Sequence, residues 1–267
     1  MRIKKVYDKG SGKTNEDELL IKDNLFAVFD GATSLVKFRD KEGRTGGEIA
    51  SKIAKHVFSK NNKSLEKMAE EANKRILNEM KKEGVETKRK EALWSTAIAA
   101  LKINKNKIEF LTIGDCVILG VFEDGKFELL NGFEEHDLET MIEWSKIRDK
   151  KLEEKWKILK AQIEKVRLKT NVDYGSMNGE KEALKFIKSG KISKEGIESI
   201  ILFTDGLIIP KKEPKEKEKW QMTVDIYQKN GLDGLLEHVR SLEKEDPECS
   251  KYPRFKQYDD VAAIGID

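Results

Sequence analysis

Short acidic motifs at the edges of apolar runs limit the possible fold and function of this 267-residue chain more than any other feature. Four of them span most of the sequence: Asn15-Glu16-Asp17, Phe29-Asp30-Gly31, Phe203-Thr204-Asp205-Gly206 and Tyr258-Asp259-Asp260. Three adjoin strand-like runs at 25–29, 200–203 and 261–266. Because strand ends hold side chains rigidly, carboxylates from distant segments can converge there. Converging carboxylates repel one another unless a cation lies among them, and Mg2+ and Mn2+ prefer such oxygen ligands.

The charge of the chain is nearly balanced. Lys and Arg number 52 against 49 Asp and Glu, which gives a formal net charge of +3. A dedicated nucleic-acid binder would carry a large basic excess, so we expect no nucleic-acid partner. The length allows a sizeable core in one large domain or two small ones. Acidic motifs near both ends favour a single domain over residues 1–267.

The sequence contains no signal for a membrane or for export. No apolar stretch approaches the roughly 18–20 residues of a transmembrane helix. The first five residues are not followed by an apolar stretch, as a signal peptide would be. Cys116 and Cys249 are far apart and outside any C-x-x-C pair, which favours free thiols in a reducing compartment. We therefore expect a cytoplasmic protein with no membrane partner.

The periodicity of the chain predicts an α+β fold. Apolar alternation and turn residues predict a hairpin over 18–29 and a meander of about four antiparallel strands over 95–130. Helical spacing predicts helices that open at 45–48 and run over 64–82. Further strands are expected at 3–7, 200–203 and 261–266, and further helices at 179–187 and 232–242.

Residues 134–170 differ from the rest because they are highly charged, with apolar residues at roughly helical spacing. This pattern predicts one long or two shorter helices inserted between strands. An insertion of this size can be a lid, a flap or a partner-binding arm. A helix layer that covers a sheet fits the pattern equally well.

The order of the motifs resembles that of a known family. Besides the four acidic motifs, Ser95-Thr96-Ala97 falls in an apolar strand, Ile113-Gly114-Asp115 precedes the next strand, and Asp260 is followed by Val261 and Ala262. Over about residues 10–266 the chain resembles the PP2C family of metal-dependent protein serine/threonine phosphatases, in its compact bacterial form. The resemblance implies a four-layer α-β-β-α sandwich of two antiparallel sheets flanked by helices. It also implies a binuclear Mg2+ or Mn2+ centre, whose bridging water attacks the phosphorus of phosphoserine or phosphothreonine in a protein substrate.

The resemblance assigns metal ligands to particular residues. Asp30 would bridge the two ions, and Gly31 would supply its backbone carbonyl. Asp205 and Asp259 would complete the ligands of the second ion. Asp260 stands where Asn is more common in the family, which leaves the ligand role with Asp259.

Other site residues follow from the same resemblance. Glu16 and Asp17 match an acidic pair that orients metal-bound waters. Asp115 matches the ligand of a third metal, although Gly-Asp between two strands is also an ordinary turn. Many members have an Arg that binds substrate phosphate where this chain has Gly12. Lys13 could supply the cation, but Lys offers a point charge and not a bidentate fork, and Arg2, Arg39 and Arg44 are the other candidates.

Two other functions remain open at this point. The missing Arg and the insertion at 134–170 also fit a pseudophosphatase that binds a partner through its helices. Lys13 and the altered flap leave a phosphatase of a small phosphorylated metabolite possible. His56, His136 and His238 are predicted on helices as surface or packing residues, with a general-acid role as the alternative for His136.

Overall fold

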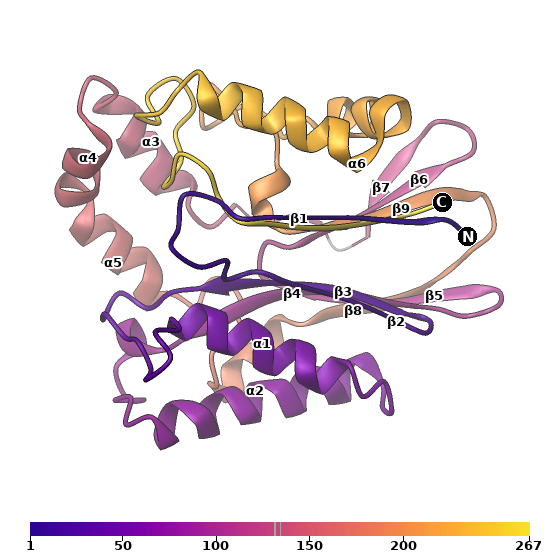
Figure 1. Ribbon diagram of the computed structural model, residues 1–267, viewed down its shortest axis with the longest axis horizontal. Helices are drawn as coiled ribbons and strands as arrows, with labels where there is room; N and C mark the ends of the chain where they lie inside the picture. Colours follow the sequence, from indigo (N-terminus) through magenta and orange to yellow (C-terminus); the bar gives the residue numbers. More distant parts are fainter. Residues whose placement is uncertain (131, 134) are drawn as a thin grey trace.

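The structure is a computed structural model that describes residues 1–130, 132–133 and 135–267. Two five-stranded sheets pack face to face, and every strand pairing within them is antiparallel (Figure 1). The first sheet has the order β1 (Ile3–Asp8), β10 (Val261–Ile266), β9 (Ile197–Phe203), β6 (Val117–Phe122), β7 (Phe127–Leu129). The second has the order β2 (Glu18–Lys22), β3 (Leu25–Ala32), β4 (Ser95–Ile103), β5 (Lys107–Ile113), β8 (Lys188–Ser193).

Helices cover the outer faces of both sheets. Helices α1 (Gly46–Phe58) and α2 (Leu65–Lys82) lie on the second sheet, and α6 (Trp220–Lys244) lies on the first (Figure 1). Short 3-10 helices are formed by Lys90–Ala92, Lys181–Phe186 and Asp205–Leu207. The predicted four-layer α-β-β-α sandwich is confirmed.

Side chains alternate between the two faces of each strand, so a single strand contributes to the apolar clusters on both of its faces. On β3, Phe26 and Val28 belong to the apolar cluster between the sheets. Leu25, Ala27 and Phe29 belong to the cluster beneath α1 and α2. Because successive side chains point to opposite faces, a strand buried on both faces is a continuous apolar run. Strand β10 alternates in the same way between the inter-sheet cluster and the cluster beneath α6.

The predicted four-stranded meander over 95–130 is wrong. Strands β5 and β6 belong to different sheets, and β6 pairs with β9 and β7. Gly114, at φ +82°, therefore turns the chain from one sheet to the other and closes no hairpin. A Cβ on Gly114 would lie 2.5 Å from the Cβ of Ala97, so this close approach requires glycine. Turn residues near β6 do not determine which sheet it joins, because its partner β9 lies about 80 residues further along the chain.

Strand β8 was not predicted from the sequence. It is an edge strand that pairs with β5 and contains mostly polar residues, Lys188-Ser189-Gly190-Lys191-Ile192-Ser193. Such a strand is held by backbone pairing, and its Lys residues suit an exposed edge. It therefore carries little apolar periodicity.

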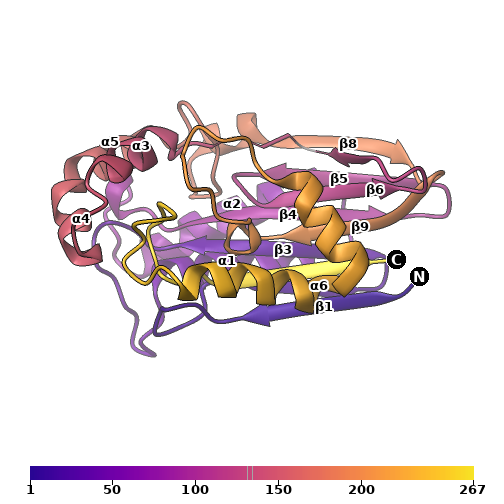
Figure 2. The ribbon, with the colours of Figure 1, turned by 90° about the horizontal axis from the view of Figure 1, so that it is seen from above.

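The charged insertion forms three helices, where one or two were predicted. They are α3 (Leu138–Lys146), α4 (Leu152–Ile158) and α5 (Lys160–Leu168), and residue 134, its expected start, lies outside the described residues. Figures 1 and 2 show these helices gathered at one end of the sandwich, opposite the two chain termini. They do not cover a sheet face. Helix α6 is also longer than predicted and changes direction at Gly231, where φ is +71°.

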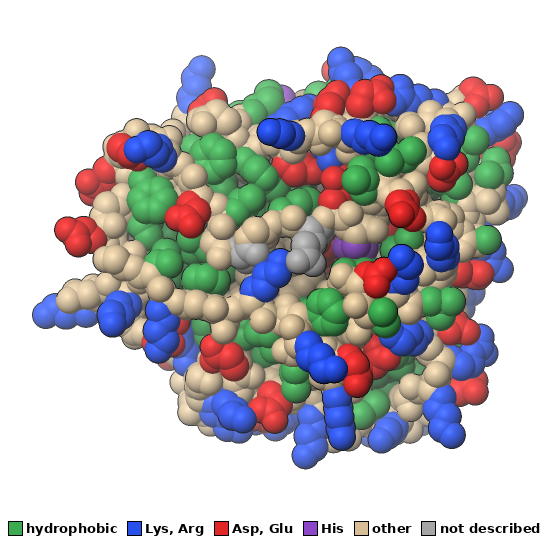
Figure 3. All heavy atoms as spheres, turned by 180° about the vertical axis from the view of Figure 1, so that it is seen from behind, with side chains coloured by type: hydrophobic (Ala, Val, Ile, Leu, Met, Phe, Trp, Pro, Cys, Tyr) green, Lys and Arg blue, Asp and Glu red, His purple; other side chains and the backbone are tan. Residues whose placement is uncertain are grey.

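Acidic and basic side chains are interspersed on the surface. Figure 3 shows both signs mixed over the face seen from behind, with small apolar areas between them. The small net charge is thus not gathered into one large region of this face. Among the described residues, no helix has both the length and the apolar character needed to span a membrane.

Asn73 on α2 provides a test of how the 176–180 segment is held. Its Nδ2 donates to the Glu180 carbonyl and its Oδ1 accepts from the Gly179 N–H, both at 2.7 Å. We expect Asn73→Ala to lower the free energy of unfolding by about 1–3 kcal/mol, because the buried Gly179 N–H loses its partner and the Glu180 carbonyl keeps only its bond from the Ala183 N–H. Asn78→Ala, at an exposed site of the same helix, should change it by less than about 0.5 kcal/mol. Urea unfolding of both variants measures the difference, and equal values would contradict this role for Asn73.

Candidate active site

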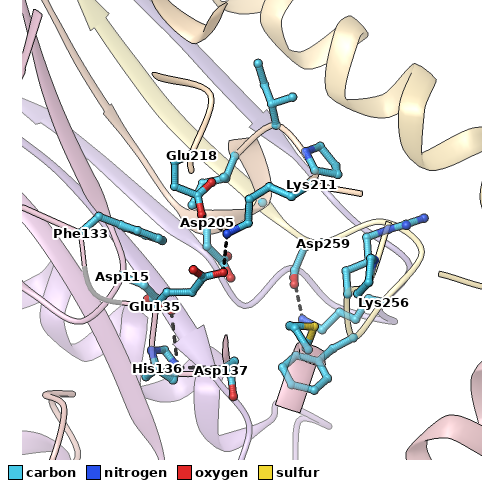
Figure 4. A pocket seen from close by; sticks show the side chains of 18 of the residues that line it. Asp115, Phe133, Glu135, His136, Asp137, Asp205, Lys211, Glu218, Lys256 and Asp259 are labelled. Atoms are coloured by element: carbon cyan, nitrogen blue, oxygen red, sulfur yellow. Dashed lines mark hydrogen bonds and ion pairs between the residues drawn. The ribbon is translucent and has the colours of Figure 1, made fainter. Parts of the chain in front are cut away.

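Strand ends bring the predicted acidic residues to the end of the sandwich where the inserted helices lie. Asp30 is near the end of β3, Asp205 directly follows β9, and Asp259 precedes β10. Asp115 lies in the crossover between β5 and β6. Asp115, Asp205 and Asp259 line a common pocket of about 200 Å3, which Figure 4 shows from close by.

The pKa values show how closely these carboxylates interact. Burial raises the pKa of Asp30 well above its usual range, and the charges of Asp205, Asp17 and Asp115 raise it further. Burial, followed by the charges of Asp259 and Asp115, raises the pKa of Asp205 to about 8. The structure thus places five predicted site carboxylates within mutual electrostatic range. Such an arrangement favours the binding of protons or metal cations.

Asp17 is the most deeply buried of these acids, with 2% of its surface exposed. Burial raises its pKa, a hydrogen bond with Thr204 opposes this, and the charges of Asp259 and Asp205 add to it. Its Oδ2 is buried and has no hydrogen-bond partner among the residues that the structure describes. A buried carboxylate oxygen without a partner is unfavourable, and a cation or an ordered water would satisfy it.

Asp260 has a different role from its neighbour Asp259. Its two carboxylate oxygens accept hydrogen bonds from the backbone N–H groups of Gly10 and Glu16, each at 2.8 Å. Asp260 therefore fixes the loop that carries Glu16 and Asp17 against the start of β10. Both oxygens of Asp260 are thus used within the chain, and the ligand role expected of Asp259 stays a prediction.

Glu16 is held by hydroxyl groups from two segments. Its Oε1 accepts hydrogen bonds from Thr33 and from Thr45, the N-cap of α1. The backbone carbonyl of Glu16 accepts from Ser51 Oγ at 2.6 Å. A Cβ on Gly31 would lie 2.4 Å from that same carbonyl oxygen, so only glycine allows β3 to pass this close.

The residues of the site fit a hydrated divalent ion. No group of three His, Cys, Asp or Glu side chains in the described part of the chain is arranged as a complete metal site. Asp17, Asp30 and Asp205 are nevertheless buried and close to one another, as their raised pKa values show, and Asp17 Oδ2 has no hydrogen-bond partner among the described residues. Mg2+ keeps several waters and needs only one or two carboxylates, so few direct protein ligands suffice.

Comparison with known sequences identifies the family. The sequence profile described as "Protein phosphatase 2C" matches residues 9–241. The chain belongs to the protein phosphatase 2C family. The PP2C resemblance and the enzyme class expected from the motifs are confirmed at the level of the family. A search of curated protein sequences gave no match.

Solved structures similar to this PP2C chain are bacterial serine/threonine phosphatases. PstP/Ppp from Mycobacterium tuberculosis is 15% identical with a TM-score of 0.60, covering 99% of this chain and 97% of that one. The PstP catalytic domain in complex with two manganese ions is 16% identical, with coverages of 99% and 96% and a TM-score of 0.59. Stp1 from Staphylococcus aureus is 14% identical, with coverages of 99% and 94% and a TM-score of 0.55. At these identities the similarity shows a shared fold.

Lys256 is a cation at this PP2C site that was not predicted from the sequence. It lines the pocket, and its Nζ lies 2.6 Å from Asp259 Oδ1 (Figure 4). Partial burial opposes its charge, but Asp259 and then Asp205 and Asp30 raise its pKa. The only sequence signal was a Lys three residues before Asp259. The predicted phosphate-binding Lys13 lies exposed and outside the pocket lining, and its role stays a prediction.

His136 lies in a turn before α3, not on a helix as predicted. It lines the pocket, and its ring stacks on that of Tyr174 at 4.2 Å between centroids. Its Nε2 is 3.2 Å from Asp137 Oδ2 and 3.9 Å from Asp115 Oδ2. Burial opposes protonation, but the hydrogen bond and charge of Asp137 outweigh it and raise the pKa of His136 to about 9. His136 is therefore neither a surface residue nor simple packing.

The inserted helices hold the segment that leads to Asp259. Trp144 of α3 donates its indole N–H to the Cys249 carbonyl at 2.9 Å. The fully buried Lys155 of α4 donates to the Glu248 carbonyl at 2.7 Å and to Ser250 Oγ at 2.8 Å. Burial lowers the pKa of Lys155, so its charge is maintained at a cost that these hydrogen bonds offset. The insertion is thus packed against residues 246–256.

Asp205 should make the stability of the metal-free protein depend on pH. Its pKa rises from 3.8 to about 8 on folding, so its contribution is fully favourable below about pH 4 and is lost as the pH rises to about 8. We expect the free energy of unfolding in EDTA to fall between pH 5 and pH 8, by more in the wild type than in Asp205→Asn. The difference should be on the order of 1 kcal/mol or more. Urea unfolding at both pH values measures it, and identical falls in the two proteins would refute this assignment.

Lys155 tests whether the insertion orders the segment before Asp259. We expect Lys155→Met to speed amide hydrogen exchange in residues 246–256, because the Glu248 carbonyl and Ser250 hydroxyl lose a charged donor. Lys157→Met, at an exposed site of the same helix, should leave that exchange unchanged. Mass spectrometry of exchanged peptides reports both. Unchanged exchange in Lys155→Met would show that the insertion does not order this segment.

Proposed function

We propose that this PP2C chain hydrolyses phosphoserine and phosphothreonine in proteins, in a reaction that depends on Mg2+ or Mn2+. The observation that carries the proposal is the electrostatic interaction of five acidic residues from distant segments, three of which line one pocket. Burial and mutual repulsion raise the pKa of three of them. A fold that buries so much like charge is stabilised by whatever cation binds there.

Two ions would be held by Asp30, the Gly31 carbonyl, Asp205 and Asp259, and a third by Asp115. When bound, they would lower the pKa of a water nucleophile and neutralise the charge of the phosphate. One of the similar structures, the PstP catalytic domain, is a complex with two manganese ions. That complex is consistent with the acidic set present here.

The other residues of the site would position the water and the substrate. Asp17, buried beside the acidic cluster, and Glu16, fixed by Thr33 and Thr45, would orient metal-bound waters. Lys13, on the loop over residues 9–17, is the phosphate-binding cation expected from the sequence, and Lys256 in the pocket lining is the competing candidate. The pocket is also lined by apolar side chains that exclude water around the leaving group: Phe133, Met141, Ile208, Ile209, Pro210, Pro253 and Phe255.

The partner-binding alternative receives less support from the structure. Three polar groups of the insertion, on Trp144, Lys155 and Trp156, make hydrogen bonds within the chain. Its Asp137 and Met141 line the pocket itself. The insertion therefore fits a wall of the active site better than a free arm.

Hydrolysis of p-nitrophenyl phosphate and of a phosphothreonine peptide, with Mn2+, Mg2+ or EDTA, tests the proposal. We expect metal-dependent turnover that falls about 100-fold or more in Asp30→Asn and in Asp205→Asn, because the ions lose charged ligands. Asp124→Asn changes a similar Asp-Gly turn that is ion-paired to Lys126 and lies outside the pocket, so it should keep full activity.

Three results would count against this function. Undiminished turnover in Asp205→Asn would remove the acidic cluster from the reaction. A folded protein that hydrolyses neither substrate with either ion would favour the binding module. A strong preference for small phosphate esters over the peptide would instead indicate a metabolite phosphatase.

A further inference from the structure

Among the described residues that line the pocket, the cationic side chains besides His136 are Lys211, Arg254 and Lys256. Two of the three are neutralised by carboxylates outside the proposed metal ligands. Lys211, with 11% of its side chain exposed, pairs with Glu135 at 2.6 Å and Glu218 at 2.7 Å. Arg254, 14% exposed, pairs with Asp246 at 2.8 Å and donates to backbone carbonyls. Each of these two cations is therefore already paired with a carboxylate that is not a proposed metal ligand.

Lys256 differs from both. Its side chain is 43% exposed, and in the part of the chain that the structure describes its ion-pair partner is Asp259, 2.6 Å away. Figure 4 shows this pair across the pocket from Glu135, His136 and Asp137. The partner of Lys256 is thus itself a proposed metal ligand.

The backbone on both sides of Lys256 is held by hydrogen bonds, while its side chain is partly exposed. The carbonyl of Phe255 accepts from the Trp156 indole at 2.9 Å, and that of Gln257 accepts from Arg254 Nε at 3.1 Å. These contacts lie directly before and after Lys256 in the chain. Such anchoring presents a flexible four-carbon side chain at a defined place in the pocket wall.

We propose that Lys256 binds the phosphate of the substrate and serves as the counter-ion of Asp259 only while no metal ion is bound. This inference rests on the proposed phosphatase function. A divalent ion bound to Asp259 takes over the negative charge that holds the ammonium group. A lysine left beside a divalent ion without a carboxylate needs another anion, and a phosphate supplies several oxygens for its three donors. Metal binding therefore releases Lys256 for the substrate.

In this proposal Lys256 takes the phosphate-binding role that was expected of Lys13 in place of the family's Arg. Lys13 lies exposed outside the pocket lining, whereas Lys256 lines the pocket together with Asp115, Asp205 and Asp259. A cation that contacts the substrate phosphate has to lie in the pocket, next to the acidic residues. The two lysines can be separated by direct binding measurements.

Titration of Mg2+-saturated protein with inorganic phosphate, followed by calorimetry, tests the inference without turnover. We expect Lys256→Met to weaken phosphate binding about tenfold or more, which corresponds to one lost charged hydrogen bond. Lys256→Arg should stay within about threefold of the wild type. The matched control is Lys251→Met, which removes a lysine of the same segment that pairs with Glu245 and does not line the pocket. It should bind phosphate as the wild type does.

The affinity for Mg2+, measured in the same variants without phosphate, separates the possible roles. For a phosphate-binding lysine, Lys256→Met weakens phosphate binding while Mg2+ binding stays equal or becomes tighter. Unchanged phosphate binding with tighter Mg2+ binding would show a counter-ion of Asp259 only and would overturn the inference. A tenfold loss in Lys13→Met and none in Lys256→Met, or a wild type that binds no phosphate, would overturn it as well.

Failure of the proposed function gives a different pattern. A wild type without metal-dependent hydrolysis, whose phosphate binding still depends on Lys256, would reject the phosphatase and retain the phosphate site. Full hydrolysis with phosphate binding independent of Lys256 would do the reverse.

Discussion

Repulsion among buried carboxylates is the constraint around which this end of the molecule is built. Asp17, Asp30 and Asp205 each have a raised pKa because burial and neighbouring acids disfavour their charged forms. The protein retains these unfavourable groups although apolar side chains would be more stable there. The stability needed to hold them comes from the sandwich, whose strands are buried on both faces. Function at this site therefore depends on a core that lies elsewhere.

Each segment that carries an acidic residue is also tied to a neighbouring element. Asp260 accepts from the backbone of the Glu16 loop, and Arg240 of α6 donates to the Asp259 carbonyl at 2.6 Å. The same guanidinium pairs with Asp8 of β1 at 2.8 Å. These contacts are polar and lie around the acidic cluster, so they fix the backbone without neutralising the carboxylates that face the pocket.

The sequence predicted the acidic residues of the site, but it did not predict the crossover between the sheets or the position of Lys256. The strand-end motifs identified Asp30, Asp205 and Asp259 because apolar runs are local signals that mark where a strand stops. The separation of β5 from β6 was missed because the choice of sheet is made by the distant strand β9. Lys256 was missed for a similar reason. Its approach to Asp259 depends on the path of residues 246–256, an irregular segment without periodicity that is shaped by contacts with α3 and α4.

The insertion connects the two segments that flank the pocket, which gives it more than a local role. Arg148, between α3 and α4, donates to the Lys212 carbonyl and pairs with Glu213, in the segment that follows Asp205. Its own carbonyl accepts from Ser250 Oγ at 2.6 Å, in the segment that precedes Asp259. Lys211 adds a buried ion pair to Glu135 at the approach to α3. A shift of these helices would therefore alter the surroundings of Asp205 and Asp259 together, so the charged insertion belongs to the site as a structural support.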